Sequence, residues 1–258
     1  MIMNSKILLY TLTRRIKSML GKKIGDDFDW STYNMHYRGE LQATKNTYTQ
    51  VLSQGDYTLI NDRLTKRNDR VPNLHPNMHL LYETILQLRP ASVLELGCGG
   101  GDHLHNLNIL SPNTRLLGLD LSEEQLAFLR ERHPALPAEC KQCDCTLPFP
   151  SDMPGVDIAY TQAVIMHMKT GNNHLVALAN LFSAATKQVI LMENWSCHDF
   201  LADINKLLDL KVLQWKKLYF YYRESEELKK PHLMIVSSVP LKYPTLSDYR
   251  ILAASVGK

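Results

Sequence analysis

The sequence predicts a doubly wound α/β fold: a seven-stranded, mostly parallel sheet with a C-terminal antiparallel hairpin, plus an N-terminal helical cap or extension. Two observations predict this class. From about residue 76 onward, short apolar β-forming runs alternate with segments of helical periodicity, which is typical of a parallel sheet with helical crossovers. A glycine-rich turn follows the first of these runs, at the edge where parallel α/β sheets bind their ligands.

The length and composition fit one core domain with an added extension. The chain has 258 residues, of which 45% are hydrophobic and 21% charged, so it can bury a sizeable core. We expect a basic amphipathic segment at residues 1–25, a cap or lid at residues 26–75 and a core domain at residues 76–258.

The first 23 residues contain six basic residues and no acidic one, although the formal net charge of the whole chain is only +3. Apolar residues recur among them at near-helical spacing, which predicts a short basic amphipathic helix. This segment either packs as a helix on a protein surface, lies as a helix on an anionic membrane, or is disordered, and the sequence leaves these alternatives open. The overall charge is too small to favour a nucleic-acid partner.

The cysteines and the apolar pattern bear on the compartment. Five cysteines are an odd number, and no convincing secretion signal precedes them, which argues against a disulfide framework. The longest apolar stretch near the N-terminus is far shorter than the roughly 20 residues that span a bilayer. We therefore expect a cytoplasmic protein, peripheral at the membrane if the basic helix binds lipid.

The cap is rich in aromatic residues. Trp30, Tyr33 and Tyr37, together with Arg38, would form a lid over a ligand or pack as an ordinary aromatic cluster. Both interpretations fit the pattern.

The core elements are expected in a regular order. A helix from about Met78 to Leu88 ends at Arg89-Pro90, because a residue before proline avoids the helical region. Helices begin near Asp102, Ser122 and Asn172, and Ser122-Glu-Glu-Gln has the form of a capping box. The expected parallel strands are Ser92–Leu96, Arg115–Leu119, Glu139–Cys143, Asp157–Thr161 and Gln188–Met192.

The C-terminal part is expected to close the sheet. A helix from about Cys197 to Asp209 precedes two β-rich runs, Lys211–Tyr222 and His232–Val239. The charged stretch between these runs has a length that suits an antiparallel hairpin.

The segment from Val93 to Asp102 is the strongest functional signal in the sequence. An apolar strand leads into Gly97, Gly99 and Gly101, and glycines permit positive φ and a close approach of a ligand to the backbone. A dinucleotide fingerprint would need a glycine at position 102, which is aspartate. Glu95 would repel a pyrophosphate but suits the cationic end of a methionine-like ligand.

This pattern resembles the first motif of the class I S-adenosylmethionine-dependent methyltransferases, E/D-x-G-x-G-x-G, and the resemblance covers about residues 76 to 195. It implies S-adenosylmethionine as cofactor. It also implies that Asp120, next to Leu121, accepts hydrogen bonds from the ribose hydroxyls, and that Asp144 and the Cys145 N–H meet the adenine. The cofactor-binding residues implied are Glu95, Gly97, Cys98, Gly99, Gly101, Asp120, Leu121, Asp144, Cys145, Thr161 and Gln162.

Two residues are candidates for catalysis. The resemblance places Thr161, Gln162 and His167 beside the transferring methyl group, where the His167 imidazole would take a proton from an acceptor hydroxyl. A helix-capping histidine is the alternative for His167. Glu193 follows the fifth strand and would bind acceptor hydroxyls or act as the base.

No metal site is expected. Cys140, Cys143 and Cys145, with His133 upstream, offer zinc ligands, but alternating side chains of a strand point to opposite faces and do not converge. His103 and His105, two apart on a helix, are expected to have no role.

The sequence thus predicts methyl transfer to an oxygen or nitrogen of a small-molecule, sugar-like acceptor. The alternative is a non-catalytic adapter that binds S-adenosylmethionine and contacts a partner through its basic helix and cap. A nicotinamide-dependent oxidoreductase is disfavoured by Asp102 and Glu95.

Overall fold

The structure is a computed structural model and describes residues 50–169, 171–195, 197–224 and 231–245. The basic segment at residues 1–25 and the aromatic residues Trp30, Tyr33, Tyr37 and Arg38 lie outside the described residues, so the expectations for them stay predictions. The boundary between cap and core at residue 76 also stays a prediction.

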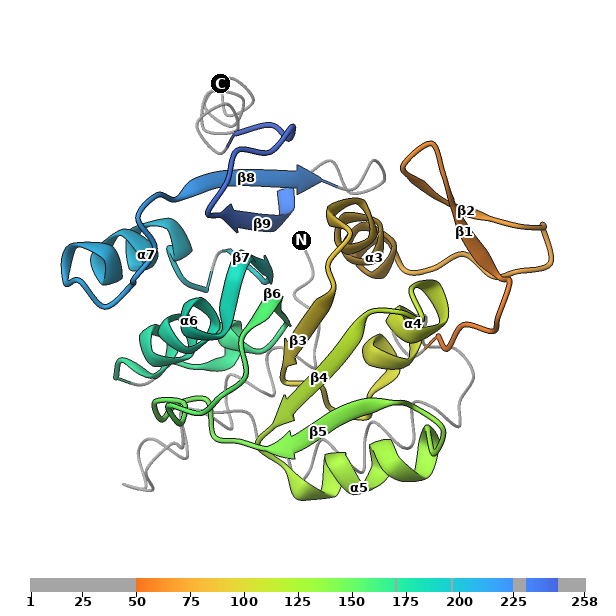
Figure 1. Cartoon of the computed structure of the whole chain (residues 1–258), viewed down its shortest axis with the longest axis horizontal. Helices are drawn as coiled ribbons and strands as arrows, with labels where there is room; N and C mark the ends of the chain where they lie inside the picture. Colours follow the sequence, from red (N-terminus) through yellow and green to blue (C-terminus); the bar gives the residue numbers. More distant parts are fainter. Residues whose placement is uncertain (1–49, 170, 196, 225–230, 246–258) are drawn as a thin grey trace, which may run out of the picture.

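A seven-stranded sheet forms the centre of the molecule (Figure 1). Its strand order is β5-β4-β3-β6-β7-β9-β8. The first five pair in parallel, and β9 is antiparallel to both of its neighbours, β7 and β8, which confirms the predicted sheet and hairpin. The strands are β3 (Ser92–Leu96), β4 (Arg115–Asp120), β5 (Ala138–Gln142), β6 (Val156–Gln162), β7 (Ala185–Met192), β8 (Tyr219–Glu224) and β9 (Pro231–Ser237).

Helices cover both faces of this sheet, because alternate side chains of a buried strand point to opposite sides. Val93 of β3 belongs to a core with the helices on one face, and Leu94 belongs to a core with the helices on the other. The first face carries α3 (Pro76–Leu88), α4 (Asp102–Leu110) and α5 (Glu123–Arg132), and the second carries α6 (Asn173–Ala184) and α7 (Phe200–Asp209). No helix within the described segments is long and apolar enough to cross a lipid bilayer.

The helix termini follow their local sequence signals. Ser122 caps α5, and its hydroxyl accepts a hydrogen bond from Gln125 N at 3.2 Å, as the capping-box pattern predicts. Arg89 ends α3 in the left-handed conformation, directly before Pro90. Asp199 caps α7 by accepting a hydrogen bond from Ala202 N at 3.1 Å, so this helix begins later than the predicted Cys197.

The predicted strand Lys211–Tyr222 is wrong over its first eight residues. Lys211 has a φ of +58°, which is incompatible with extended structure, and no strand is formed from 211 to 218. Trp215 instead donates a hydrogen bond from Nε1 to the Ala185 carbonyl at 3.2 Å and packs edge-on against Phe182. The β-forming residues of this run therefore serve tertiary packing rather than a strand.

A short hairpin precedes the core and was not predicted from the sequence. Strands β1 (Tyr57–Ile60) and β2 (Arg63–Lys66) pair antiparallel through a two-residue turn at Asn61 and Asp62, whose φ angles are +49° and +60°. Consecutive positive φ angles are typical of a type I′ hairpin turn. The described part of the expected helical cap, residues 50–75, is therefore a β-hairpin with flanking loops.

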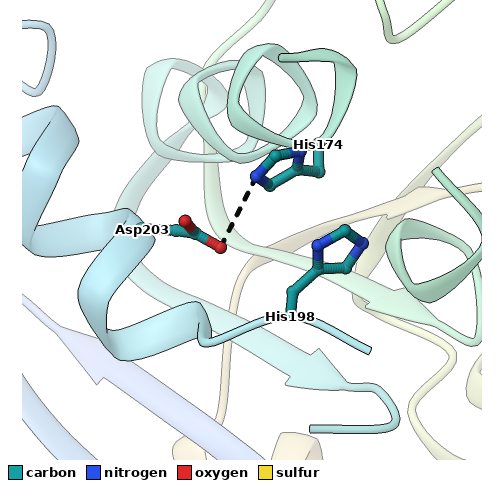
Figure 2. Close-up of side chains that lie close together, drawn as sticks. All are labelled: His174, His198 and Asp203. Carbon is teal, nitrogen blue, oxygen red and sulfur yellow. Dashed lines mark ion pairs between the residues drawn. The ribbon is translucent and has the colours of Figure 1, made fainter. Parts of the chain in front are cut away.

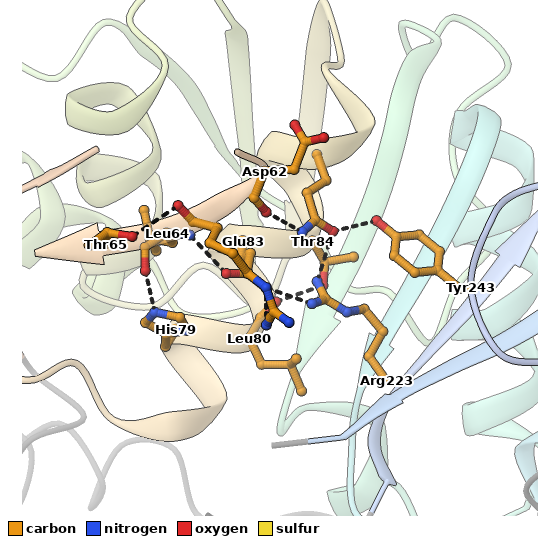
Figure 3. Close-up of polar contacts among 11 residues, drawn as sticks. Asp62, Leu64, Thr65, His79, Leu80, Glu83, Thr84, Arg223 and Tyr243 are labelled. Atoms are coloured by element: carbon orange, nitrogen blue, oxygen red, sulfur yellow. Dashed lines mark hydrogen bonds and ion pairs between the residues drawn. The ribbon is translucent and has the colours of Figure 1, made fainter. Parts of the chain in front are cut away.

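A buried ion pair joins this hairpin to α3 and to the C-terminal hairpin (Figure 3). The Glu83 carboxylate accepts hydrogen bonds from Arg223 Nη2 at 2.6 Å and from the Leu64 backbone N–H at 2.8 Å. Arg223 also donates to Thr84 Oγ1 at 2.7 Å and lies over the ring of Tyr243. Segments far apart in the sequence are thereby held together by charge-assisted hydrogen bonds.

Candidate active site

The glycine-rich turn between β3 and α4 is held against the end of β4. The backbone N–H groups of Gly97 and Cys98 both donate to the Leu119 carbonyl, at 2.7 and 3.0 Å, and Gly101 N donates to Cys98 O at 2.9 Å. These bonds fix the turn at the carboxyl edge of the parallel strands, where such sheets bind ligands.

Glycine is required at this turn for both conformation and space. Gly97, Gly99 and Gly101 have φ angles of +79°, +49° and +81°. A Cβ on Gly97 would lie 2.3 Å from Val164 Cγ2, in the loop that follows β6. At Gly99 the nearest atom to a Cβ is Gln125 Oε1, at 3.8 Å, so space remains beside this backbone for a ligand. The loops after β3 and β6 are thus in contact.

Asp120 ends β4 next to the glycine turn. Its Oδ2 accepts a hydrogen bond from Gly99 N at 2.8 Å, and its Oδ1 accepts one from Ser122 N at 2.9 Å. Burial raises the pKa of this carboxyl, although these backbone hydrogen bonds oppose the shift. Each oxygen has a second lone pair, so the carboxylate can also accept from two vicinal hydroxyls. Leu121 beside it is 49% exposed and offers an apolar surface at the same edge.

Asp144 and Cys145 follow β5. Asp144 Oδ1 accepts hydrogen bonds from the backbone N–H and the hydroxyl of Thr146, at 2.9 and 2.6 Å, which holds its carboxylate in place. The Cys145 carbonyl accepts a hydrogen bond from Asn180 Nδ2 at 3.0 Å, and burial raises the pKa of the Cys145 thiol to about 12. The backbone here is therefore anchored on the α6 side, at the same sheet edge as Asp120.

Three buried acceptor oxygens around the glycine turn have no hydrogen-bond partner among the described residues: Glu95 Oε2, Gln125 Oε1 and Gln162 Oε1. Glu95 faces Tyr160, but neither Glu95 Oε2 nor the Tyr160 hydroxyl makes a hydrogen bond of acceptable geometry there. Burial raises the pKa of Glu95 well above its usual range. S-adenosylmethionine carries an ammonium, two ribose hydroxyls and an adenine amino group, so these acceptors fit its donors.

Gln125 also shows why the capping box is incomplete. In a full capping box its side chain would accept a hydrogen bond from Ser122 N, but Asp120 Oδ1 already accepts it. The amide oxygen of Gln125 is left beside Gly99 instead.

Glu193 follows β7 and holds the loop after β6. Its Oε1 accepts hydrogen bonds from Thr161 Oγ1 at 2.9 Å, Val164 N at 3.1 Å and Ile165 N at 3.2 Å, and its Oε2 accepts one from Met166 N at 3.0 Å. This carboxylate caps the N-terminus of the short 3-10 helix η2 (Ile165–His167). Burial raises its pKa, while the four hydrogen bonds oppose that shift.

His167 is the last residue of η2 and is partly buried. Burial lowers the pKa of its imidazole, and the positive charge of Lys169 lowers it further. The ring is therefore neutral at pH 7 and can accept a proton. The structure places His167 on the loop whose Val164 contacts Gly97 of the glycine turn.

Asp102 has a structural function that the sequence did not reveal. Its Oδ1 lies 2.6 Å from Arg132 Nε and 2.7 Å from His133 Nε2, and the carboxylate is almost fully buried. The residue that breaks the dinucleotide pattern thus connects the first turn of α4 to the end of α5 beneath the glycine turn. The only sequence signal was the unusual residue at this position.

The cysteines do not assemble into a metal site within the described segments. Cys98 and Cys140 are neighbours, whereas His133 is bound to Asp102. A different set of ligand-type side chains, His174, His198 and Asp203, does come together, and the sequence had assigned none of them a role.

Comparison with known proteins supports the assignment of the domain. Residues 93–188 match the family model described as "Methyltransferase domain". An uncharacterized 37.1 kDa protein in transposon TN4556 of Streptomyces fradiae is 35% identical over 85 residues, which are 32% of this chain and 25% of that protein. The match therefore spans only a quarter of the length of that relative.

The fold is similar to that of a solved methyltransferase structure. A TehB-like SAM-dependent methyltransferase from Corynebacterium glutamicum superposes with a TM-score of 0.51 over 83% of this chain and 97% of that chain, at 15% identity. The methyltransferase domain of bacterial CtHen1-C covers 63% of this chain and 96% of that chain, with a TM-score of 0.49 and 15% identity.

The strand order, the glycine turn and the family match agree with the resemblance read from the sequence. Residues 93–188 are therefore similar to a methyltransferase domain, and the fold around them is similar to that of an S-adenosylmethionine-dependent methyltransferase of known structure.

Proposed function

We propose that this enzyme methylates an oxygen or a nitrogen of a small-molecule, sugar-like acceptor, with His167 as the general base. The observation that carries this proposal is the neutral, partly buried imidazole of His167 on the loop after β6. That loop contacts the glycine turn through Val164. A proton acceptor is thereby provided beside the loop that would hold the donor.

The donor would be held by residues from three strand ends. The space beside Gly99 and the second lone pairs of Asp120 suit the ribose, and Asp144 with the Cys145 backbone suits the adenine. The unpartnered oxygen of Glu95 suits the ammonium group, and a bound cation would lower the raised pKa of this carboxyl. Bound S-adenosylmethionine supplies a methyl group that its sulfonium already makes electrophilic.

The protein then has to orient the acceptor and remove its proton. His167 takes the proton of an acceptor hydroxyl as that oxygen attacks the methyl carbon, and the imidazole becomes imidazolium. Because burial lowers the pKa of His167, the ring is in the unprotonated form that this step requires at neutral pH.

Glu193 is proposed to position this loop and not to act as the base. Both of its carboxylate oxygens already accept hydrogen bonds, from three backbone N–H groups of the loop and from Thr161. A buried carboxylate occupied in this way is poorly placed to receive a proton from an acceptor. Thr161 is likewise occupied, because its hydroxyl donates to Glu193.

The test is a methyl-transfer assay over a panel of hydroxyl- and amino-bearing small molecules, including sugars, with His167→Ala beside the unchanged protein. A general base contributes roughly 100- to 10,000-fold, so turnover should fall by that range. Affinity for S-adenosylhomocysteine, measured by calorimetry, should stay within about twofold, because His167 is not among the proposed donor ligands. Equal turnover in the two proteins would remove His167 from the mechanism.

The same panel separates catalysis from the adapter alternative. A protein that binds S-adenosylhomocysteine but methylates no member of a broad panel would contradict the proposed acceptor class and favour binding without catalysis. The basic segment and most of the cap on which that alternative depends lie outside the described residues.

A further inference from the structure

Three ligand-type side chains gather on the α6–α7 side of the sheet (Figure 2). His174 lies in the first turn of α6, His198 in the connection between β7 and α7, and Asp203 in the first turn of α7. One ligand atom from each residue lies within 4.8 Å of the others. The side chains of His174 and Asp203 are 16% and 20% exposed, so the cluster is shielded but reachable from solvent.

A hydrogen bond to the backbone determines which ring nitrogen of His198 can bind a ligand. His198 Nε2 lies 3.1 Å from the Ile165 carbonyl oxygen, so this nitrogen donates the hydrogen bond, and Nδ1 is the ring nitrogen left to bind a ligand. Figure 2 shows one nitrogen of His198 on the side of His174 and Asp203. A backbone carbonyl that fixes the tautomer of a histidine is a common outer-shell partner of metal-binding histidines.

The three groups do not satisfy one another. His174 Nε2 and Asp203 Oδ2 are 3.6 Å apart, which is too long for a good hydrogen bond, and His174 Nδ1 is buried without a partner among the described residues. Two imidazoles and a carboxylate around one centre are a ligand set that suits a divalent transition-metal ion.

We propose that His174, His198 and Asp203 form a three-ligand site for a divalent transition-metal ion. Two imidazoles and one carboxylate suit Zn²⁺, which in such sites keeps a fourth position for water or another ligand. This inference does not depend on which acceptor the enzyme methylates. The ion would tie the first turns of α6 and α7 together and, through the bond from His198 to Ile165, would stiffen η2.

The geometry also predicts a movement on binding. Zn²⁺ binds nitrogen and oxygen at about 2.0–2.2 Å, which places tetrahedral ligand atoms about 3.4 Å from one another. In the structure the ligand atoms of the three residues lie within 4.8 Å of one another, so they have to move closer. The rings of His174 and His198 are stacked, with centroids 4.4 Å apart and planes 14° from parallel. The lone pairs of parallel rings do not meet, so one imidazole has to turn and the stack has to open.

The experiment uses the full chain, freed of metal by a chelator and titrated with ZnCl₂ by calorimetry. We expect about one Zn²⁺ per chain. His198→Ala and Asp203→Asn should weaken this binding about 100-fold or more, because each removes one of three ligands. Asp209→Asn, an exposed aspartate at the other end of the same helix, is the matched control and should bind as the unchanged protein does.

Nuclear magnetic resonance of the histidine rings tests the same site without a substitution. The ring signals of His174 and His198 should shift with Zn²⁺, whereas that of His79, whose ring bonds the Leu64 carbonyl, should not. Absence of Zn²⁺ binding, or equal binding by Asp203→Asn and Asp209→Asn, would overturn the proposal. Titrating the metal-free protein with S-adenosylhomocysteine tells this failure apart from a failure of the proposed methyl transfer.

Discussion

Glu193 provides the most detailed test of how the site is positioned. In Glu193→Gln the amide oxygen can keep the three hydrogen bonds now made by Oε1, but the amide nitrogen would meet Met166 N, a second donor. A hydrogen bond to a charged group contributes about 1.5–3 kcal/mol, and the three retained bonds weaken as they become neutral. Burial raises the pKa of Glu193, which means that burying its charge costs free energy. Removing the charge therefore offsets part of the stability lost with the weakened hydrogen bonds. We expect a net destabilisation of about 3 kcal/mol.

Hydrogen exchange measures this effect directly at the loop. A decrease of about 3 kcal/mol in the free energy of opening this loop corresponds to roughly a 100-fold increase in its opening equilibrium constant. The backbone amides of Val164, Ile165 and Met166 should therefore exchange about 100-fold faster. The midpoint of thermal unfolding should fall by about 6–12 °C.

Glu83→Gln is the matched control, because Glu83 is also a buried carboxylate but lies in the network with Arg223. It should lower the unfolding midpoint without a selective change in exchange at the loop. Normal exchange of the three loop amides in Glu193→Gln would refute the positioning function.

Three further predictions follow from the same contacts. Asp120→Asn should weaken S-adenosylhomocysteine binding about 10- to 100-fold in calorimetry, since one charge-assisted acceptor is lost. Asp157→Asn is the control and should not weaken it, because Asp157 lies near the start of β6, at the sheet edge opposite the glycine turn. Equal affinities of the two variants would contradict the ribose contact. Because the pKa of His167 is lowered below its ordinary 6.5, turnover should stay level from pH 8 to about 6.5 and fall only at lower pH; a fall that begins above pH 7 would argue against this base. Asp102→Asn should destabilise the fold by about 2–4 kcal/mol in chemical unfolding, because it weakens a buried ion pair with Arg132; an unchanged midpoint would show that the pair is not stabilising.

Local signals predicted most of the core. The apolar run at residues 92–96 and the glycines after it predicted β3 and its turn. A buried parallel strand requires consecutive apolar residues, and positive φ angles favour glycine, so both features can be read from neighbouring residues. The capping serine at position 122 set the start of α5 for the same reason.

Features that depend on distant contacts could not be predicted from the sequence. The partners of Asp102 lie 30 and 31 residues away on another helix, and no local pattern records that pairing. The four donors around Glu193 meet it only because β6 and β7 end side by side. The hairpin of β1 and β2 has strands of only four residues, which carry too little alternation to stand out.

The metal-type cluster illustrates the same limit. His174 and His198 come from different elements, and only the packing of α6 against α7 brings them to Asp203. Their spacing of 24 residues in the sequence matches none of the short ligand patterns of zinc sites.

Calorimetric titration of the full chain with S-adenosylhomocysteine, compared with NAD under the same conditions, tests whether the glycine turn holds a sulfonium nucleoside. We expect saturable one-to-one binding of S-adenosylhomocysteine and no binding of NAD, because Asp102 and Glu95 stand where a pyrophosphate would need glycine and no negative charge. Absence of binding to S-adenosylhomocysteine, or a preference for NAD, would show that the turn does not bind the methyl donor.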